Sequence, residues 1–162
     1  MALHDCSISS RNIRKWRNKT SYGLVPKKVK AAVWFSTNPI WEETANKKYL
    51  DSDGNIHSGT KEITHIIGGG LLRIEVFPEA APYDWEDYKR KSGDKKRMLK
   101  GLDTVARKMG ADPEEWRVSF KPVPREKWIT VEVWDSISKK WVDFMEAYTK
   151  AEKAAKRKEI LN

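Results

Sequence analysis

Two β-prone segments joined by a short turn lie near the C-terminal end of the chain. Residues 128–134 read WITVEVW, residues 140–144 read KWVDF, and the turn sequence DSISKK connects them. β-Branched and aromatic residues are enriched in strands, and two such runs joined by a short polar turn pair antiparallel. The sequence therefore predicts a β-hairpin here, and the fold must contain an antiparallel sheet around it.

Two further segments are predicted to be strands in the body of the protein. Residues 31–35, AAVWF, form a continuous apolar run of the kind found in buried strands. Residues 71–77, LLRIEVF, alternate in character, with Arg73 and Glu75 on one side of the strand and Ile74 on the other. We expect both segments to contribute to the core.

Helical segments separate and follow these strands. The clearest spans residues 94–110, and its expected apolar stripe repeats at spacings of 4, 3 and 4: Met98, Leu102, Val105 and Met109. Shorter helices are expected over residues 8–18 and 40–49. The sequence thus predicts one α+β domain over residues 1–144, with a mostly antiparallel sheet and several short helices. A charged C-terminal helix is expected over residues 145–162.

The composition is that of a globular protein. The chain has 162 residues, 39% of them hydrophobic and 34% charged, and no apolar run approaches the roughly 20 residues of a membrane-spanning helix. The single Cys6 excludes an internal disulfide and a zinc site built on several cysteines. His57 and His65 have no third ligand at a metal-like spacing. We therefore expect a cytoplasmic protein that holds no metal.

Positive charge is concentrated in an N-terminal arm, residues 1–30. The formal net charge is +9, and the arm holds eight Lys and Arg against one Asp, whereas residues 31–144 hold 19 of each sign. Such a concentration favours a phosphate-bearing partner, which is a nucleic acid, a dinucleotide or both. The residues expected to contact it are Arg11, Arg14, Lys15, Trp16 and Arg17, with the indole stacking on a base. The alternatives are an arm that only aids solubility and an indole that anchors the arm to the core.

Eight tryptophans are many for a chain of this length. Trp34, Trp128 and Trp134 lie in apolar strands, and we expect them in the core. Trp41, Trp85 and Trp116 each lie near the start of a predicted short helix, and we expect them to pack there as anchors.

Glu132 is a carboxylate inside the apolar strand 128–134. Because side chains alternate along a strand, the simplest interpretation is that Glu132 faces water. A carboxylate fixed on a rigid strand can instead orient a ribose 2′-hydroxyl and stabilise an oxocarbenium-like centre while a glycosidic bond breaks. The residues alone leave both interpretations open.

The order of these features resembles the ADP-ribosyltransferase fold. A His-containing first segment, LHDCS at residues 3–7, precedes a short helix, the turn GLVP at residues 23–26, the segment VWFST at residues 33–37, and a late strand with Glu132. The resemblance is to the group that includes RNA 2′-phosphotransferases and DNA-modifying ADP-ribosyltransferase toxins. The chain also resembles small uncharacterised bacterial proteins through the segments VWFSTNPIWEETA, GADPEEWRVSF and PVPREKWITVEVW.

This resemblance implies roles for individual residues. His4 would hydrogen-bond the adenosine-side ribose of NAD, and Glu132 would be the catalytic carboxylate. Ser36, together with Phe35 or Trp34, would line the nicotinamide pocket. Phosphate contacts would come from Arg11, Arg14 and Lys15. The implied activity is NAD-dependent transfer of ADP-ribose to a nucleic acid or a protein, and the basic arm favours nucleic acid.

Two other classes of function fit the same sequence. A non-catalytic nucleic-acid-binding module would use the basic arm and Trp16 and would carry Glu132 as a surface residue. A protein-interaction factor, such as a toxin, an antitoxin or a host-directed inhibitor, would bind its partner through the helix expected over residues 145–162.

Overall fold

The computed structural model describes residues 12–13 and 28–160 of the chain. The site residues expected in the N-terminal arm and its first strand lie outside this part: His4, Arg11, Arg14, Lys15, Trp16 and Arg17. Every strand pairing among the described residues is antiparallel, and helices lie between the strands. The expected α+β class of a single domain is therefore confirmed.

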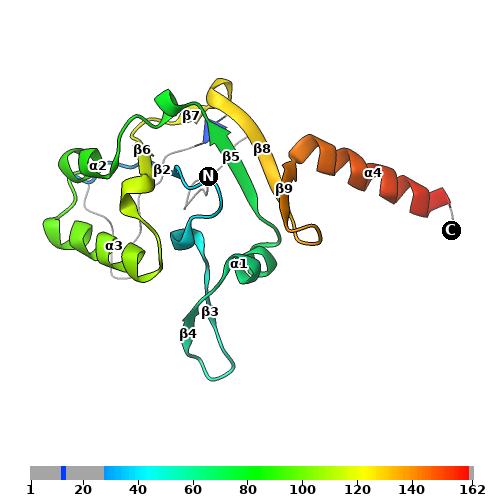
Figure 1. Cartoon of the computed structure of the whole chain (residues 1–162), viewed down its shortest axis with the longest axis horizontal. Helices are drawn as coiled ribbons and strands as arrows, with labels where there is room; N and C mark the ends of the chain where they lie inside the picture. Colours follow the sequence, from blue (N-terminus) through cyan, green and yellow to red (C-terminus); the bar gives the residue numbers. More distant parts are fainter. Residues whose placement is uncertain (1–11, 14–27, 161–162) are drawn as a thin grey trace.

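A three-stranded sheet carries the predicted hairpin. β8 (Trp128–Asp135) lies between β5 (Leu72–Val76) and β9 (Lys140–Asp143), as Figure 1 shows. Trp134 on β8 is directly opposite Trp141 on β9, so the hairpin places two indoles side by side. The sequence prediction of this hairpin is confirmed.

A second strand pair lies beside this sheet. β2 (Val33–Ser36) pairs with β6 (Trp116–Ser119), with Phe35 opposite Arg117. Two smaller pairs complete the strands of the described chain: β1 (Asn12–Ile13) with β7 (Val123–Pro124), and β3 (Lys48–Leu50) with β4 (Ile56–Ser58).

The two faces of β2 contribute to two hydrophobic clusters. Val33 and Phe35 pack against β5 in a sheet cluster, whose other members are Ile74, Val76, Ala80, Ala81 and Val123. The intervening residues Ala32 and Trp34 point to the opposite face and pack in an aromatic cluster. Its other members include Trp85, Tyr88, Leu99, Ala106, Trp116 and Val118. Successive side chains of a strand point to opposite faces, so a strand buried on both faces is apolar throughout. This explains the unbroken apolar run at residues 31–35.

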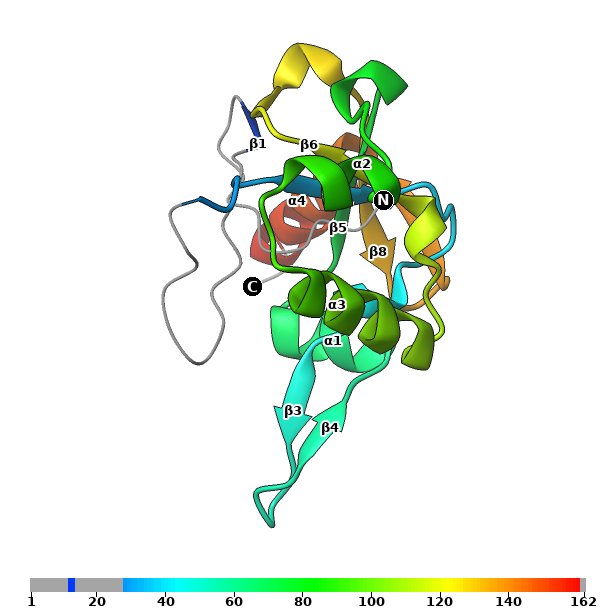
Figure 2. The ribbon, with the colours of Figure 1, turned by 90° about the vertical axis from the view of Figure 1, so that its left-hand side faces the viewer.

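Four α-helices lie around the strands in the described chain: α1 (Lys61–Gly68), α2 (Trp85–Lys91), α3 (Lys96–Lys108) and α4 (Phe144–Ile160). Side-chain oxygens begin two of them, because Thr60 accepts from the amide of Ile63 and Asp84 accepts from the amide of Asp87. Single 3₁₀ turns are η1 (Glu43–Ala45), η2 (Pro78–Ala80), η3 (Pro113–Glu115) and η4 (Arg125–Lys127). Figures 1 and 2 show α2 and α3 near the β2–β6 pair, and Figure 1 shows α4 extending away from the body.

The helical prediction over residues 40–49 is wrong. Residues 40–49 form only the turn η1 before β3 begins, because the Oδ1 atom of Asn38 accepts the amide hydrogens of Ile40 and Trp41. These local hydrogen bonds hold the backbone in a turn rather than a helix. The helix predicted over residues 8–18 is contradicted at Asn12–Ile13, which form the strand β1, and the other residues of that prediction lie outside the described part of the chain.

The buried face of α3 also differs from the expected stripe. Leu99 and Ala106 are 7% and 0% exposed, whereas Met98 and Val105 are 43% and 52% exposed. The observed and expected stripes are offset by one residue, which is about 100° around a helix. The small Ala106 allows α3 to approach its neighbours closely, and this favours the Leu99 face over the longer methionines.

Replacement of Leu99 by Ala should lower the free energy of unfolding by about 2 to 4 kcal/mol, because it leaves a cavity in the aromatic cluster. The matched change Met98→Ala should cost less than about 1 kcal/mol, since that side chain is largely solvated. Urea denaturation of both variants measures the difference. Equal losses would contradict the orientation of α3.

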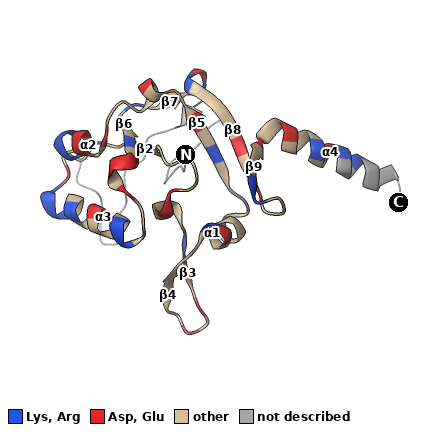
Figure 3. Ribbon diagram, in the orientation of Figure 1, with Lys and Arg blue, Asp and Glu red and all other residues tan. Residues whose placement is uncertain are grey.

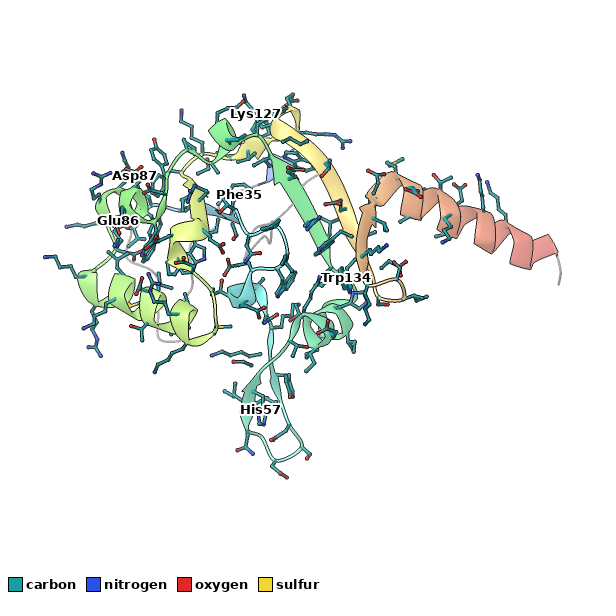
Figure 4. All side chains as sticks on the ribbon, in the orientation of Figure 1. Phe35, His57, Glu86, Asp87, Lys127 and Trp134 are labelled. Carbon is teal, nitrogen blue, oxygen red and sulfur yellow. The ribbon has the colours of Figure 1, made fainter. Side chains whose placement is uncertain are left out.

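The β3–β4 hairpin projects from the body and carries a polar cluster at its tip. The Nε2 atom of His57 lies 2.7 Å from Oδ2 of Asp51, and the amide of Asn55 donates to Oδ1 at 2.8 Å (Figure 4). These hydrogen bonds, with that from His57 the strongest cause, lower the pKa of Asp51 from 3.8 to about 2.

The ionised form of Asp51 is therefore favoured in the folded hairpin. Its hydrogen bonds should be fully formed above pH 3.8 and lost as the pH falls through about 2. Carbon-detected NMR titration of the Asp51 carboxyl group measures this midpoint. His57→Ala should move the midpoint upward, and an unchanged midpoint would show that His57 does not cause the shift.

Candidate functional site

A cavity of about 550 Å³ lies between the end of β2 and the neighbouring strands β5 and β8. Its polar lining includes Ser36 from β2, Arg73 and Glu75 from β5, Arg117 from β6, and Glu132 from β8. Its apolar lining comes from Phe35, Pro39, Val76, Phe77, Pro78, Ala81 and Pro82. The cavity therefore has an apolar wall and four charged groups, two of each sign.

The structure brings three of the expected site residues to this cavity. Phe35 and Ser36 line it from β2, and Glu132 lines it from β8. Trp34 does not line it, because its indole packs into the aromatic cluster, with ring centroids 4.3 Å from Tyr88 and 5.6 Å from Trp116. Of the two aromatic residues expected to accompany Ser36, the cavity thus contains Phe35.

Glu132 and Arg73 form an ion pair in the cavity wall. They are register partners on β8 and β5, and the Nε atom of Arg73 donates to Oε2 of Glu132 at 2.5 Å. The two side chains are 18% and 23% exposed. The Nη1 atom of Arg73 also donates to the carbonyl of Pro39 at 2.9 Å, which ties the loop after β2 to the sheet. Among the described residues, no donor hydrogen-bonds Oε1 of Glu132, so this oxygen is available to a ligand.

An indole supports the guanidinium of Arg73 from outside the cavity. The Cζ atom of Arg73 lies 4.5 Å from the ring centroid of Trp141, which is within the range of a cation–π contact. Arg73 is therefore held by a carboxylate, a carbonyl and an aromatic face at once. A guanidinium with so many partners fixes the position of Glu132.

Arg117 is the second cation of the cavity. Its Nη1 atom donates to the carbonyls of Glu114 and Trp116 at 2.8 and 2.7 Å. Among the described residues, its Nε and Nη2 atoms have no acceptor, so both remain able to bind an anion. Planar guanidinium groups are well suited to phosphate, because their N–H groups match its oxygens.

Ser36 and its neighbours differ in what they offer a ligand. The Oγ atom of Ser36 accepts the amide hydrogen of Asn38 at 3.1 Å, and its own hydroxyl hydrogen has no acceptor among the described residues. Asn38, in contrast, uses both atoms of its amide, since Oδ1 accepts from the loop and Nδ2 donates to Glu115 at 3.2 Å. Ser36 can therefore donate to a ligand, whereas Asn38 shapes the loop.

Arg73 and Arg117 line the cavity but were not among the site residues predicted from the sequence. The sequence feature that could have identified both arginines is a charged residue inside a β-prone segment, which is also the feature that identified Glu132. For Arg73, the alternation of residues 71–77 already separated its side from the apolar side. Its pairing with Glu132 depends on a strand register between residues that lie 59 positions apart.

Comparison with known proteins assigns neither a family nor a function to the chain. The chain matches no protein-family model, no curated protein and no solved structure. Within the described residues, no group of three or more His, Cys, Asp and Glu side chains could hold a metal ion. No helix in the same part of the chain is long and apolar enough to cross a membrane.

The ion pair between Arg73 and Glu132 should contribute to the free energy of unfolding by holding β5 and β8 together. A double-mutant cycle with Arg73→Gln and Glu132→Gln should give a coupling energy of about 1 kcal/mol, because both groups are mostly shielded from solvent. Urea denaturation of the wild type, both single variants and the double variant provides the four free energies. A coupling near zero would show that the ion pair does not form in solution.

Proposed function

We propose that this cavity binds NAD and that the protein transfers ADP-ribose to an acceptor, with Glu132 as the catalytic carboxylate. The observation that supports the proposal is the meeting of Phe35, Ser36 and Glu132 at one cavity. Glu132 lies about a hundred positions after Phe35 and Ser36 in the sequence, and the resemblance to ADP-ribosyltransferases assigns the three residues to one site.

The size and lining of the cavity suit part of a dinucleotide. Small-molecule sites usually enclose roughly 300 to 1,000 Å³, and this cavity encloses about 550 Å³. Phe35 and the prolines offer an apolar surface for a planar ring such as nicotinamide. Arg117 has N–H groups available for a phosphate, and Ser36 has a hydroxyl hydrogen for an amide or ribose oxygen.

In the proposed reaction, Glu132 acts on the ribose attached to nicotinamide. Oε1 accepts a hydrogen bond from the 2′-hydroxyl, while Arg73 holds the other carboxylate oxygen in place. The bond between C1′ and the nicotinamide nitrogen breaks, and its electron pair returns to the ring, so that nicotinamide leaves neutral. The negative carboxylate stabilises the oxocarbenium-like centre. An acceptor oxygen or nitrogen then bonds to C1′ and releases its proton to solvent.

The charge distribution supports nucleic acid as the acceptor. The basic arm, residues 1–30, holds eight of the 32 Lys and Arg of the chain. A second group of cations lies at the start of α3, where Figure 3 shows basic residues gathered: Lys95, Lys96, Arg97 and Lys100. All four are exposed, and they form no ion pair with a described carboxylate. Free surface cations of this kind attract the phosphate backbone of a nucleic acid.

Glu132→Gln should reduce the release of nicotinamide from NAD by about 100-fold or more, since the amide loses the charge that stabilises the oxocarbenium-like centre. Glu75→Gln is the matched control, because Glu75 lines the same cavity from the neighbouring strand. That control should retain most of the activity. Nicotinamide release is measured by chromatography, with water or single-stranded nucleic acid as the acceptor.

Binding is measured separately from turnover. NAD should raise the melting temperature of the wild type and of Glu132→Gln alike, because ligand that binds only the native state stabilises it. Full activity of Glu132→Gln would exclude the proposed role of the carboxylate. A melting temperature that NAD leaves unchanged in every variant would exclude the cavity as an NAD site.

A further inference from the structure

A lysine side chain is surrounded by three tryptophans on the face of the sheet that also carries Glu132, next to the cavity. The Nζ atom of Lys61 lies 3.1 Å from the ring centroid of Trp134, 4.8 Å from that of Trp141 and 5.6 Å from that of Trp41. We call these three indoles the tryptophan cage. Figure 4 labels Trp134 at the end of the sheet next to α1.

The walls of the cage come from three separate elements. Trp134 and Trp141 are register partners on β8 and β9, and their rings meet edge to face with centroids 5.4 Å apart. Trp41, in the loop before η1, stacks on Trp141 at 6.3 Å. The hairpin and this loop therefore form an aromatic enclosure, and only its occupant, Lys61, comes from α1.

The cage holds the Lys61 amine against aromatic rings rather than against a carboxylate of the described residues. Within the described part of the chain, Lys61 forms no ion pair. Burial lowers the pKa of its amine, because fewer water molecules surround the charge. The negative faces of the indoles replace part of that hydration, as they do wherever aromatic rings surround an ammonium group.

We propose that the tryptophan cage is a binding site for a methylated ammonium group and that Lys61 occupies it as an internal competitor. Methylated ammonium is less strongly hydrated than the lysine head group, so it loses less on entering an aromatic enclosure. Lys61 is the first residue of α1 and has a flexible four-carbon stem. Its head group can therefore swing into solvent while the helix and the three indoles stay in place.

Removal of the competitor should expose the site. Choline is the probe, and its neutral isostere 3,3-dimethyl-1-butanol is the control for shape without charge. Lys61→Ala should bind choline at least about tenfold more tightly than the wild type, equivalent to about 1.4 kcal/mol. The isostere should bind weakly to both proteins.

The contribution of the cage is tested by adding Trp41→Ala to Lys61→Ala, which should abolish choline binding. Because Trp41 lies outside the sheet, Trp134 and Trp141 remain in place on the hairpin. Titration calorimetry measures the binding of both ligands to all three proteins.

Two sources of the ligand are separated by a second probe. A short peptide with trimethyl-lysine that binds Lys61→Ala more tightly than choline does would support the site with a modified protein as its ligand. Tighter binding of choline would support it with a small molecule as the ligand. Lys61→Gln provides a second opening of the cage, and thermal melts confirm that each variant folds.

Three results would overturn the proposal. The first is the absence of saturable choline binding to both Lys61→Ala and Lys61→Gln. The second is equal binding of choline and its neutral isostere, which would show an apolar crevice rather than a cation site. The third is choline binding that survives the loss of Trp41. None of these results depends on NAD, so the test of the tryptophan cage is independent of the test of the proposed reaction.

Discussion

Burial of β2 on both faces is the constraint on which the rest of the structure depends. Val33 and Phe35 face the sheet cluster, while Ala32 and Trp34 face the aromatic cluster. The strand thereby holds the three-stranded sheet on one side and the helices α2 and α3 on the other. Where the strand ends, Phe35 and Ser36 reach the cavity. The position of the candidate site is thus a consequence of how the two clusters share one strand.

A chain of contacts connects the cavity with the tryptophan cage. Glu132 pairs with Arg73, Arg73 lies on one face of Trp141, and Lys61 also lies within 5 Å of that ring. Two cations beside one indole repel each other, and Arg73 accordingly contributes to the lowered pKa of Lys61. Displacement of the Lys61 ammonium from the cage would therefore change the electrostatic surroundings of the guanidinium that holds Glu132.

Local sequence patterns predicted those parts of the fold whose determinants are local. The hairpin of β8 and β9 follows from two β-prone segments and a short turn, and β2 follows from its unbroken apolar run. The failure at residues 40–49 has a local cause of another kind, because one Asn38 side chain takes two amide hydrogens from the backbone. Propensity averaged over a window does not register such a single competing acceptor.

The parts of the site that sequence reasoning missed depend on contacts between distant residues. Glu132 was identified from its own segment, but its partner is set by the register of β5 against β8. Arg117 reaches the cavity because β6 pairs with β2, which places it opposite Phe35. The same dependence on tertiary packing decided the face of α3, where Leu99 rather than Met98 is buried. Neither periodicity nor spacing contains this information.

The strand β9 continues directly into the helix α4, without a connecting loop. Asp143 ends the strand, Phe144 begins a helix of 17 residues, and that helix is about 25 Å long. Its principal contacts with the described body are with β8 and β9. Because the helix is anchored at one end, a rotation at the junction of β9 and α4 would move the far end of α4 more than the junction itself.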